Sequence, residues 1–158
     1  MKDARLIGIA QYAIGRPPER LCCLGLGSCV AVFIYDPDTK IGGVLHALLP
    51  RKPAKKDPDP KYTDSGIKIL YDEIVSKGAK KRKLIAKLVG GAQMFPNLDL
   101  GISDIGTENI REARKTLQSL GVEVVSEEVK GNKGRSAYYS LETGDVTIRT
   151  AFSADKVI

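Results

Sequence analysis

Apolar side chains recur at i, i+3, i+4, i+7 and i+8 through residues 67–75, the spacing of one face of an α-helix. These side chains are Ile67, Leu70, Tyr71, Ile74 and Val75. Asp64 or Ser65 can cap the start of this helix, and Gly78 stands where a terminating glycine belongs. Because a helix with one apolar face must bury it, the rest of the chain has to supply a packing surface.

Short apolar stretches that are typical of β-strands provide that surface. We expect them at residues 6–13, 21–26, 30–35, 41–49, 84–89, 122–129, 137–141 and 146–151. A second helix is expected from near Thr107 to Gly121, with Ile110, Ala113 and Leu117 on its apolar side. The order of strands, helix, strand, helix and strands predicts an α/β fold, a layered α/β sandwich with two main helices packed on β-sheet.

Length and composition are those of one globular domain over residues 1–158, with 42% hydrophobic and 28% charged residues. Residues 50–61 hold four prolines and several lysines, which predicts a loop. No apolar run approaches the roughly 20 residues of a membrane helix, and the N-terminus lacks the features of a signal peptide. We therefore expect no membrane insertion and a cytoplasmic location.

The net charge of +6 is concentrated in two basic runs, at residues 51–56 and 77–83. Such runs suit an acidic partner or a solvated face. Neither run alternates with aromatic residues, so a stacking platform for nucleic acid is not indicated. We expect no nucleic-acid partner; a basic nucleic-acid binder is the weakest alternative, and it predicts a steep loss of affinity with salt.

All three cysteines lie between residues 22 and 29. Cys22 and Cys23 are adjacent, so on a strand they point to opposite faces and are poorly placed to pair with each other. An odd number of cysteines also argues against a secreted disulfide framework. No C-x₂-C knuckle is present, which argues against zinc, and we expect no metal.

Cys29 has the local features of a nucleophile. It follows Gly25-Leu26-Gly27-Ser28, and glycines permit a sharp turn that presents the next side chain and leaves backbone N–H groups free for an oxyanion. The chain's single histidine, His46, follows seventeen residues later and can take the thiol proton. A lone cysteine and a lone histidine are more often core residues, so this pattern alone leaves both interpretations open.

The stretch LGLGSCV at residues 24–30, followed by His46, resembles CheD, the family of chemoreceptor glutamine deamidases. Further motifs follow in the family's order: KYTD at 61–64, AKLVGGAQMF at 86–95, Ile105-Gly106 with Asn109, and Gly131-Asn132 with Gly134-Arg135-Ser136. The resemblance covers residues 7–149. Several motifs in register are far more specific than any one of them.

The resemblance implies hydrolysis of receptor glutamine side chains to glutamate and ammonia. In that reaction the Cys29 thiolate attacks the amide and His46 serves as base and acid, so no cofactor is needed. The local geometry, rather than the resemblance, makes the N–H of Cys29 the expected oxyanion donor. We expect Ser28, Gly27, Gly90 and Gly91 to shape the substrate site. Close strand packing is the alternative for the glycines.

Two positions depart from the family pattern. Cys23 stands where the family has a catalytic threonine, and a thiol is a weaker hydrogen-bond partner for histidine than a hydroxyl is. We therefore expect either Cys23 or a backbone carbonyl to orient His46. Glu108 stands where the family usually has arginine, and a carboxylate is favourable near a helix start.

The resemblance also implies two partners: the cytoplasmic domains of methyl-accepting chemoreceptors, and the CheC phosphatase. The basic runs near residues 52–56 and 80–83 are expected to meet acidic receptor helices. The alternative to an enzyme is a CheD-like binding module, weakened at Cys23, that regulates CheC. Such a module would not need Cys29 or His46.

Overall fold

A computed structural model of the 158-residue protein describes residues 3–94 and 104–158. The helices are α1 (Thr63–Ser76), the short 3₁₀ helix η1 (Lys81–Lys83) and α2 (Ile105–Ser119). The strands are β1 (Arg5–Leu6), β2 (Gln11–Gly15), β3 (Arg20–Leu26), β4 (Val30–Tyr35), β5 (Gly42–Ala47), β6 (Ile85–Gly90), β7 (Glu123–Val129), β8 (Arg135–Ser140), β9 (Val146–Thr150) and β10 (Lys156–Val157).

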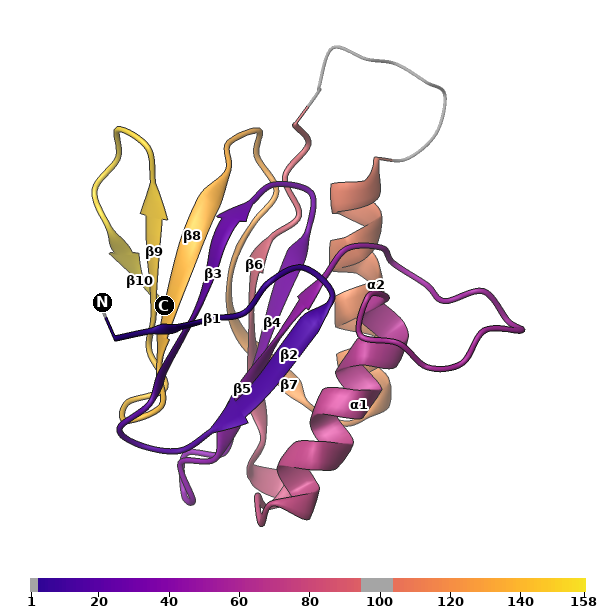
Figure 1. Ribbon diagram of the computed structural model, residues 1–158, viewed down its shortest axis with the longest axis vertical. Helices are drawn as coiled ribbons and strands as arrows, with labels where there is room; N and C mark the ends of the chain where they lie inside the picture. The colour runs from indigo at the N-terminus through magenta and orange to yellow at the C-terminus, as the bar shows by residue number, and fades with distance from the viewer. Residues whose placement is uncertain (1–2, 95–103) are drawn as a thin grey trace.

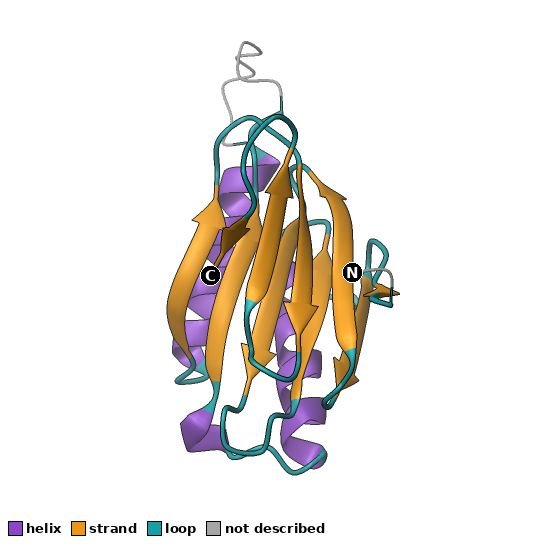
Figure 2. Cartoon of the chain, turned by 90° about the vertical axis from the view of Figure 1, so that its left-hand side faces the viewer, coloured by secondary structure: helices purple, strands orange, loops and turns teal. Residues whose placement is uncertain are grey.

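The strands form two five-stranded sheets that pack face to face (Figure 2). The central sheet has the order β2-β5-β4-β6-β7, and the outer sheet has the order β1-β3-β8-β9-β10. Both helices cover the side of the central sheet that faces away from the outer sheet (Figure 1). The α/β fold with two main helices on a sheet is therefore confirmed. The second sheet is an additional layer.

Strand β4 lies in the middle of three layers, with the helices on one side of the central sheet and the outer sheet on the other. All six of its residues are buried, and successive side chains point to opposite faces. Val30, Val32 and Ile34 face the helices and join one core cluster with the apolar sides of α1 and α2. Ala31 and Phe33 face the outer sheet and join a second cluster with residues of β3, β8 and β9. The first cluster fixes the helices, and the second holds the two sheets together.

The predicted strand at residues 6–13 is wrong, since the structure has β1 and β2 with a turn between them. Ala10 adopts a φ of 65°, which an extended strand cannot include. The turn lets the chain leave the outer sheet after Leu6 and enter the central sheet at Gln11. The other predicted strands are present, and their ends differ from the predicted ones by at most two residues.

The expected caps are partly wrong. Helix α1 starts at Thr63, with Tyr62 at the N-cap and no side-chain cap, so Asp64 and Ser65 lie inside its first turn. Helix α2 starts two residues before Thr107, and the N-cap is Asp104, whose carboxylate accepts from the Thr107 N–H at 2.9 Å. Gly78 has a φ of 113°, as expected after a helix end.

No helix in the described ranges is long and apolar enough to cross a membrane. Phe95, the last residue of the 86–95 motif, lies outside the described residues.

Candidate active site

Cys29 lies where the chain passes from the outer sheet to the central sheet. Strand β3 ends at Leu26 and β4 starts at Val30, so only three residues make the crossing. The crossing begins with an irregularity in β3 between Cys23 and Leu26. There Gly25 adopts a φ of 62°, and its N–H donates to the Ser136 hydroxyl at 3.1 Å. The predicted sharp turn before Cys29 is therefore present.

Three successive carbonyl groups anchor this crossing. The Gly27 carbonyl accepts from the Ala92 N–H at 2.9 Å, and the Cys29 carbonyl accepts from the Gly91 N–H at 2.8 Å. Between them, the Ser28 carbonyl accepts from the side-chain amide of Asn109 at 2.8 Å. The backbone that carries the thiol is thus tied on one side to the end of β6 and to α2.

His46 lies on the same face of the central sheet as Cys29. It is directly opposite Ala31 in the antiparallel β4–β5 pair, and Ala31 faces the space between the sheets. Cys29, two residues before Ala31, belongs to the same inter-sheet cluster. Cys29 directly precedes β4, so the thiol and the His46 ring lie on the same inner face of the central sheet. His46 is 3% exposed and Cys29 is 7% exposed.

The His46 ring is oriented by the main chain. Its Nδ1 lies 3.0 Å from the carbonyl oxygen of Ile7, in the turn between β1 and β2. Because a carbonyl oxygen only accepts, Nδ1 carries the proton in the neutral ring, which leaves the lone pair on Nε2. The Ala10 N–H donates to the His46 carbonyl at 2.8 Å, so the same turn also holds the backbone of this residue.

The electrostatics favour a neutral pair. Burial raises the pKa of the Cys29 thiol above 9.0, and its own backbone N–H opposes this in part. Burial lowers the pKa of His46 below 6.5, and the Ile7 carbonyl opposes that shift. At neutral pH the resting state is therefore a thiol beside a neutral imidazole, which is the state from which an imidazole acts as a general base.

The adjacent cysteines point to opposite faces, as expected. Cys23 faces inward and is fully buried, whereas the sulfur of Cys22 lies 3.9 Å from the Ala4 carbonyl on the other side of the strand. Burial is the largest cause that raises the pKa of Cys23 to about 12, and the neighbouring Cys22 and Cys29 raise it further. Cys23 therefore stays protonated at neutral pH. Of the two proposed acceptors for His46, the backbone carbonyl is the one bonded to it.

The glycines expected near the substrate are closely packed. A Cβ on Gly90 would lie 2.4 Å from the Cys29 carbonyl oxygen, and one on Gly91 would lie 2.3 Å from a side-chain carbon of Ile110. A Cβ on Gly27 would lie 3.2 Å from the Met94 side chain. Close packing accounts for Gly90 and Gly91, while substrate contact by Gly27, Ser28 and these two glycines stays a prediction.

Two side chains to which the sequence analysis gives no role, Asn109 and Thr63, contact the backbone next to the site. Asn109 is fully buried and donates to the Ser28 carbonyl at 2.8 Å and to the Leu48 carbonyl at 3.1 Å. Thr63 places its hydroxyl 3.0 Å from the Leu49 carbonyl and 3.4 Å from Asn109 Oδ1. A polar residue on the buried side of the predicted second helix was the signal that could have identified Asn109.

Glu108, the second departure from the family pattern, contributes to an ion-pair cluster at the start of α2. It pairs with Arg111 on the same helix and lies 3.8 Å from the Arg51 guanidinium. Glu112, one turn further on, lies 3.2 Å from the same guanidinium. These contacts attach the loop after β5 to α2, close to the crossing that carries Cys29.

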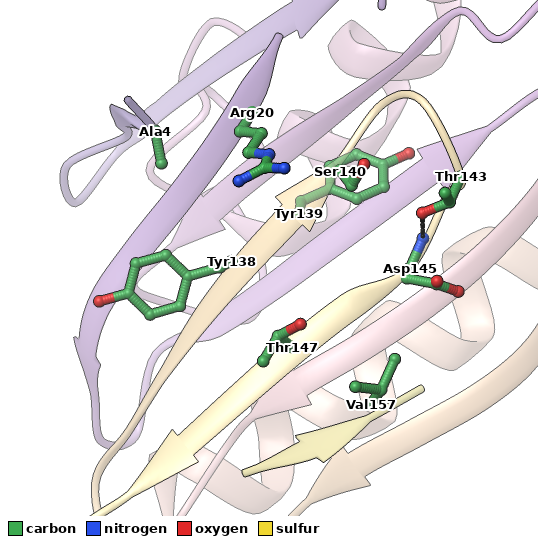
Figure 3. A pocket seen from close by; sticks show the side chains of 9 residues that line it. All are labelled: Ala4, Arg20, Tyr138, Tyr139, Ser140, Thr143, Asp145, Thr147 and Val157. Atoms are coloured by element: carbon green, nitrogen blue, oxygen red, sulfur yellow. Dashed lines mark hydrogen bonds between the residues drawn. The ribbon is translucent and has the colours of Figure 1, made fainter. Parts of the chain in front are cut away.

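A cavity of about 300 Å³ lies away from this site, on the exposed face of the outer sheet (Figure 3). Arg20, Tyr138 and Thr147 are among the residues that line it, and neither Cys29 nor His46 is. Within the described ranges, His, Cys, Asp and Glu side chains form no group of three or more that could hold a metal.

Fold and site together define a class of protein: a layered α/β domain with a thiol and an imidazole on one inner wall of its double sheet. The family model described as "CheD chemotactic sensory transduction" matches residues 48–150, which is more than half of the chain. This chain therefore belongs to the CheD family.

The relatives extend the match across the site residues. A protein of Methanosarcina acetivorans named "Probable chemoreceptor glutamine deamidase CheD 1" is 46% identical, and the match covers 97% of this chain and 96% of that one. A Thermotoga maritima protein named "Chemoreceptor glutamine deamidase CheD" is 39% identical, with 92% and 90% covered. The resemblance noted from the sequence is thus confirmed.

One solved structure, a Bacillus licheniformis hypothetical protein YfiH, is similar with a TM-score of 0.49 and 18% identity. The match covers 74% of this chain and 51% of that one.

Proposed function

We propose that this chain is a chemoreceptor glutamine deamidase that converts receptor glutamine side chains to glutamate and releases ammonia. The observation that carries the proposal is the shared face of Cys29 and His46, with the His46 lone pair left on Nε2. The names of relatives that match nearly the whole chain support the same reaction and the same class of substrate.

In the first half-reaction, Nε2 of His46 takes the thiol proton as the Cys29 sulfur attacks the amide carbon of glutamine. The resulting tetrahedral intermediate collapses as the carbon–nitrogen bond breaks. His46 gives the proton to the departing nitrogen, which leaves as ammonia. The receptor side chain is then held as a thioester on Cys29.

In the second half-reaction, His46 takes a proton from water as the water oxygen attacks the thioester carbonyl. The carbon–sulfur bond breaks, and the proton returns to the Cys29 sulfur. The products are a glutamate side chain and the free enzyme. The chain's own thiol and imidazole supply both steps, so the proposal includes no cofactor and no metal.

The test is deamidation of a chemoreceptor cytoplasmic fragment from the same organism. Wild type is expected to release ammonia and to change the peptide mass from amide to acid, and Cys29→Ala is expected to do neither. Loss of turnover with Cys22→Ala as well would contradict the assignment of Cys29, because Cys22 points away from the site. Receptor binding without any turnover by wild type would favour the binding module.

We further propose that the receptor meets the basic loop at residues 50–61. Helix α1 begins beside this loop and runs about 21 Å to its other end, where the second basic run lies. The two basic runs therefore lie at opposite ends of α1, and we propose the first run as the main receptor contact, while contact by both runs stays a prediction.

Charge neutralisation tests this contact. Changing Lys52, Lys55, Lys56 and Lys61 to glutamine is expected to weaken receptor binding, and more strongly at low salt. The matched control changes Lys77, Lys81, Arg82 and Lys83, which removes the same charge at the far end of α1. Equal effects from the two sets, or none from the first, would contradict the proposed contact.

A CheC phosphatase as second partner, and action in the cytoplasm where receptor signalling domains lie, complete the proposal. Both are what the resemblance to the CheD family implies, and the family match supports a role in chemotactic signalling. Co-purification of wild type with CheC from the same organism is the measurement that checks the first.

A further inference from the structure

The side-chain amide of Asn109 has an orientation that its neighbours dictate. Two carbonyl oxygens, of Ser28 and Leu48, lie 2.8 and 3.1 Å from its nitrogen. Carbonyl oxygens only accept, so the NH₂ group must face them and give one proton to each. The amide oxygen then faces the Thr63 hydroxyl at 3.4 Å. Asn109 is 0% exposed, so water does not replace these bonds.

The two bonds reach the backbone on either side of the reacting pair. Ser28 directly precedes Cys29, and Leu48 follows His46 by two residues. These positions lie at the neighbouring ends of β4 and β5, which pair with each other. One buried side chain on α2 thus fixes both strand ends at the site.

The bond to Ser28 also determines where the Cys29 N–H points. The Ser28 carbonyl and the Cys29 N–H belong to one peptide unit, which is trans, and a trans unit holds the two groups in opposite directions. Since Asn109 holds the carbonyl towards α2, the N–H points away from α2. That N–H lies close enough to the Cys29 sulfur to counteract part of the rise in the thiol pKa.

We propose that Asn109 is a positioning residue that fixes the Ser28–Cys29 peptide unit so that the Cys29 N–H is presented to the oxyanion of the tetrahedral intermediate. The inference rests on the proposed function, because it concerns the same thiol. It goes beyond that function by assigning the support of the oxyanion donor to a side chain on α2. The Gly27 carbonyl accepts from the Ala92 N–H at 2.9 Å, so the Ser28 N–H of the same peptide unit points away from Ala92.

The test compares two reactions of the Cys29 thiol that need no receptor. Acylation by p-nitrophenyl acetate passes through a tetrahedral oxyanion, and alkylation by iodoacetamide does not. In Asn109→Asp an oxygen replaces the NH₂ group, so the Ser28 carbonyl loses its donor. We expect acylation to slow about 10- to 100-fold, below the 10²–10³ of a fully lost oxyanion donor, with alkylation unchanged. Receptor deamidation should lose kcat with KM unchanged.

The control is Thr116→Val, a buried polar position on the same helix, two turns beyond Asn109. It should leave the ratio of acylation to alkylation at the wild-type value. If Asn109→Asp does not fold, Thr63→Val carries the test, because it removes the hydroxyl facing Asn109 Oδ1 and keeps both amide protons. It should lower the same ratio by a smaller factor.

Two results would overturn the inference. One is an unchanged ratio in the variants, and the other is an equal fall of both rates, which would mean that Asn109 places the thiol and not the oxyanion donor. Failure of the proposed function is a separate result. Wild type that acylates readily but never deamidates receptor fragments contradicts that function and leaves the role of Asn109 standing.

Discussion

Nδ1 of His46 lies 3.0 Å from the main-chain oxygen of Ile7, so the backbone orients the imidazole at this site. The two residues are 39 positions apart in the chain, and the turn between β1 and β2 brings them together. The Ile7 N–H in turn donates to the Cys22 carbonyl at 2.8 Å, which holds this turn against the outer sheet. The orientation of the His46 ring therefore depends on the packing of the two sheets.

Replacing Cys23 should reduce kcat far less than loss of the general base would. Because the Ile7 carbonyl already accepts from His46, we expect kcat in Cys23→Thr and Cys23→Ala to fall by less than tenfold, short of the ~10²–10⁴ that loss of a general base costs. Steady-state deamidation of a receptor fragment measures this. A loss as large as that of His46→Asn, the reference variant, would show that Cys23 orients the base.

The pH dependence of kcat/KM should report a neutral His46. Because burial lowers the pKa of His46, the ring loses its proton below pH 6.5, so activity should fall only at a pH below that value. The raised pKa of Cys29 means that alkylation by iodoacetamide should keep increasing beyond pH 9. An alkylation rate that is already maximal at pH 6 would indicate a thiolate–imidazolium pair and contradict this prediction.

Alkali should destabilise the protein partly through Cys23. A raised folded-state pKa favours the protonated thiol, so its contribution is complete below the unfolded pKa near 9 and is lost as pH rises towards about 12. Cys23→Thr removes this loss. Urea unfolding should show the variant gaining on wild type by about 1.4 kcal/mol per pH unit above 9. A constant difference between the two proteins would exclude this titration.

Gly90→Ala should disturb the site in two ways, through backbone strain at position 90 and through a clash with the backbone of Cys29. Its φ is 106°, and the new Cβ would lie 2.4 Å from the Cys29 carbonyl oxygen. We expect destabilisation of about 1–3 kcal/mol and a large loss of kcat. Gly121→Ala is the matched control, because its φ is 73° and nothing lies within 4 Å of the new Cβ. Equal effects of the two changes on kcat would contradict the packing argument.

The sequence predicts much of this fold because its signals are local. The apolar stripe of α1, the strands at residues 30–35 and 41–49 and the glycines after both helices each follow from neighbouring residues, and each is present. The second sheet could not be predicted, because the pairing of β3 with β8 joins segments more than 100 residues apart. The turn at residues 7–10 was also missed, since nothing in its composition marks the positive φ of Ala10.

The candidate site was predictable only in part, for a related reason. Cys29 and His46 stand out by residue type, and the turn before Cys29 stands out by its glycines. The groups that contact the backbone of Cys29 and the ring of His46 do not stand out in the sequence. Asn109 acts through bonds to carbonyls 61 and 81 positions away, and the Ile7 oxygen is an atom that every residue possesses. Their roles arise only when the sheets and α2 pack.

A main-chain acceptor for His46 has a consequence for how this enzyme family can vary. Every residue has a main-chain carbonyl, so a substitution at position 7 that keeps the turn also keeps this acceptor. Because the Ile7 carbonyl orients His46, the residue at position 23 needs only to fill the space between the sheets. The group that orients His46 can then be invisible in an alignment of sequences, and the absence of a threonine at position 23 does not remove that group.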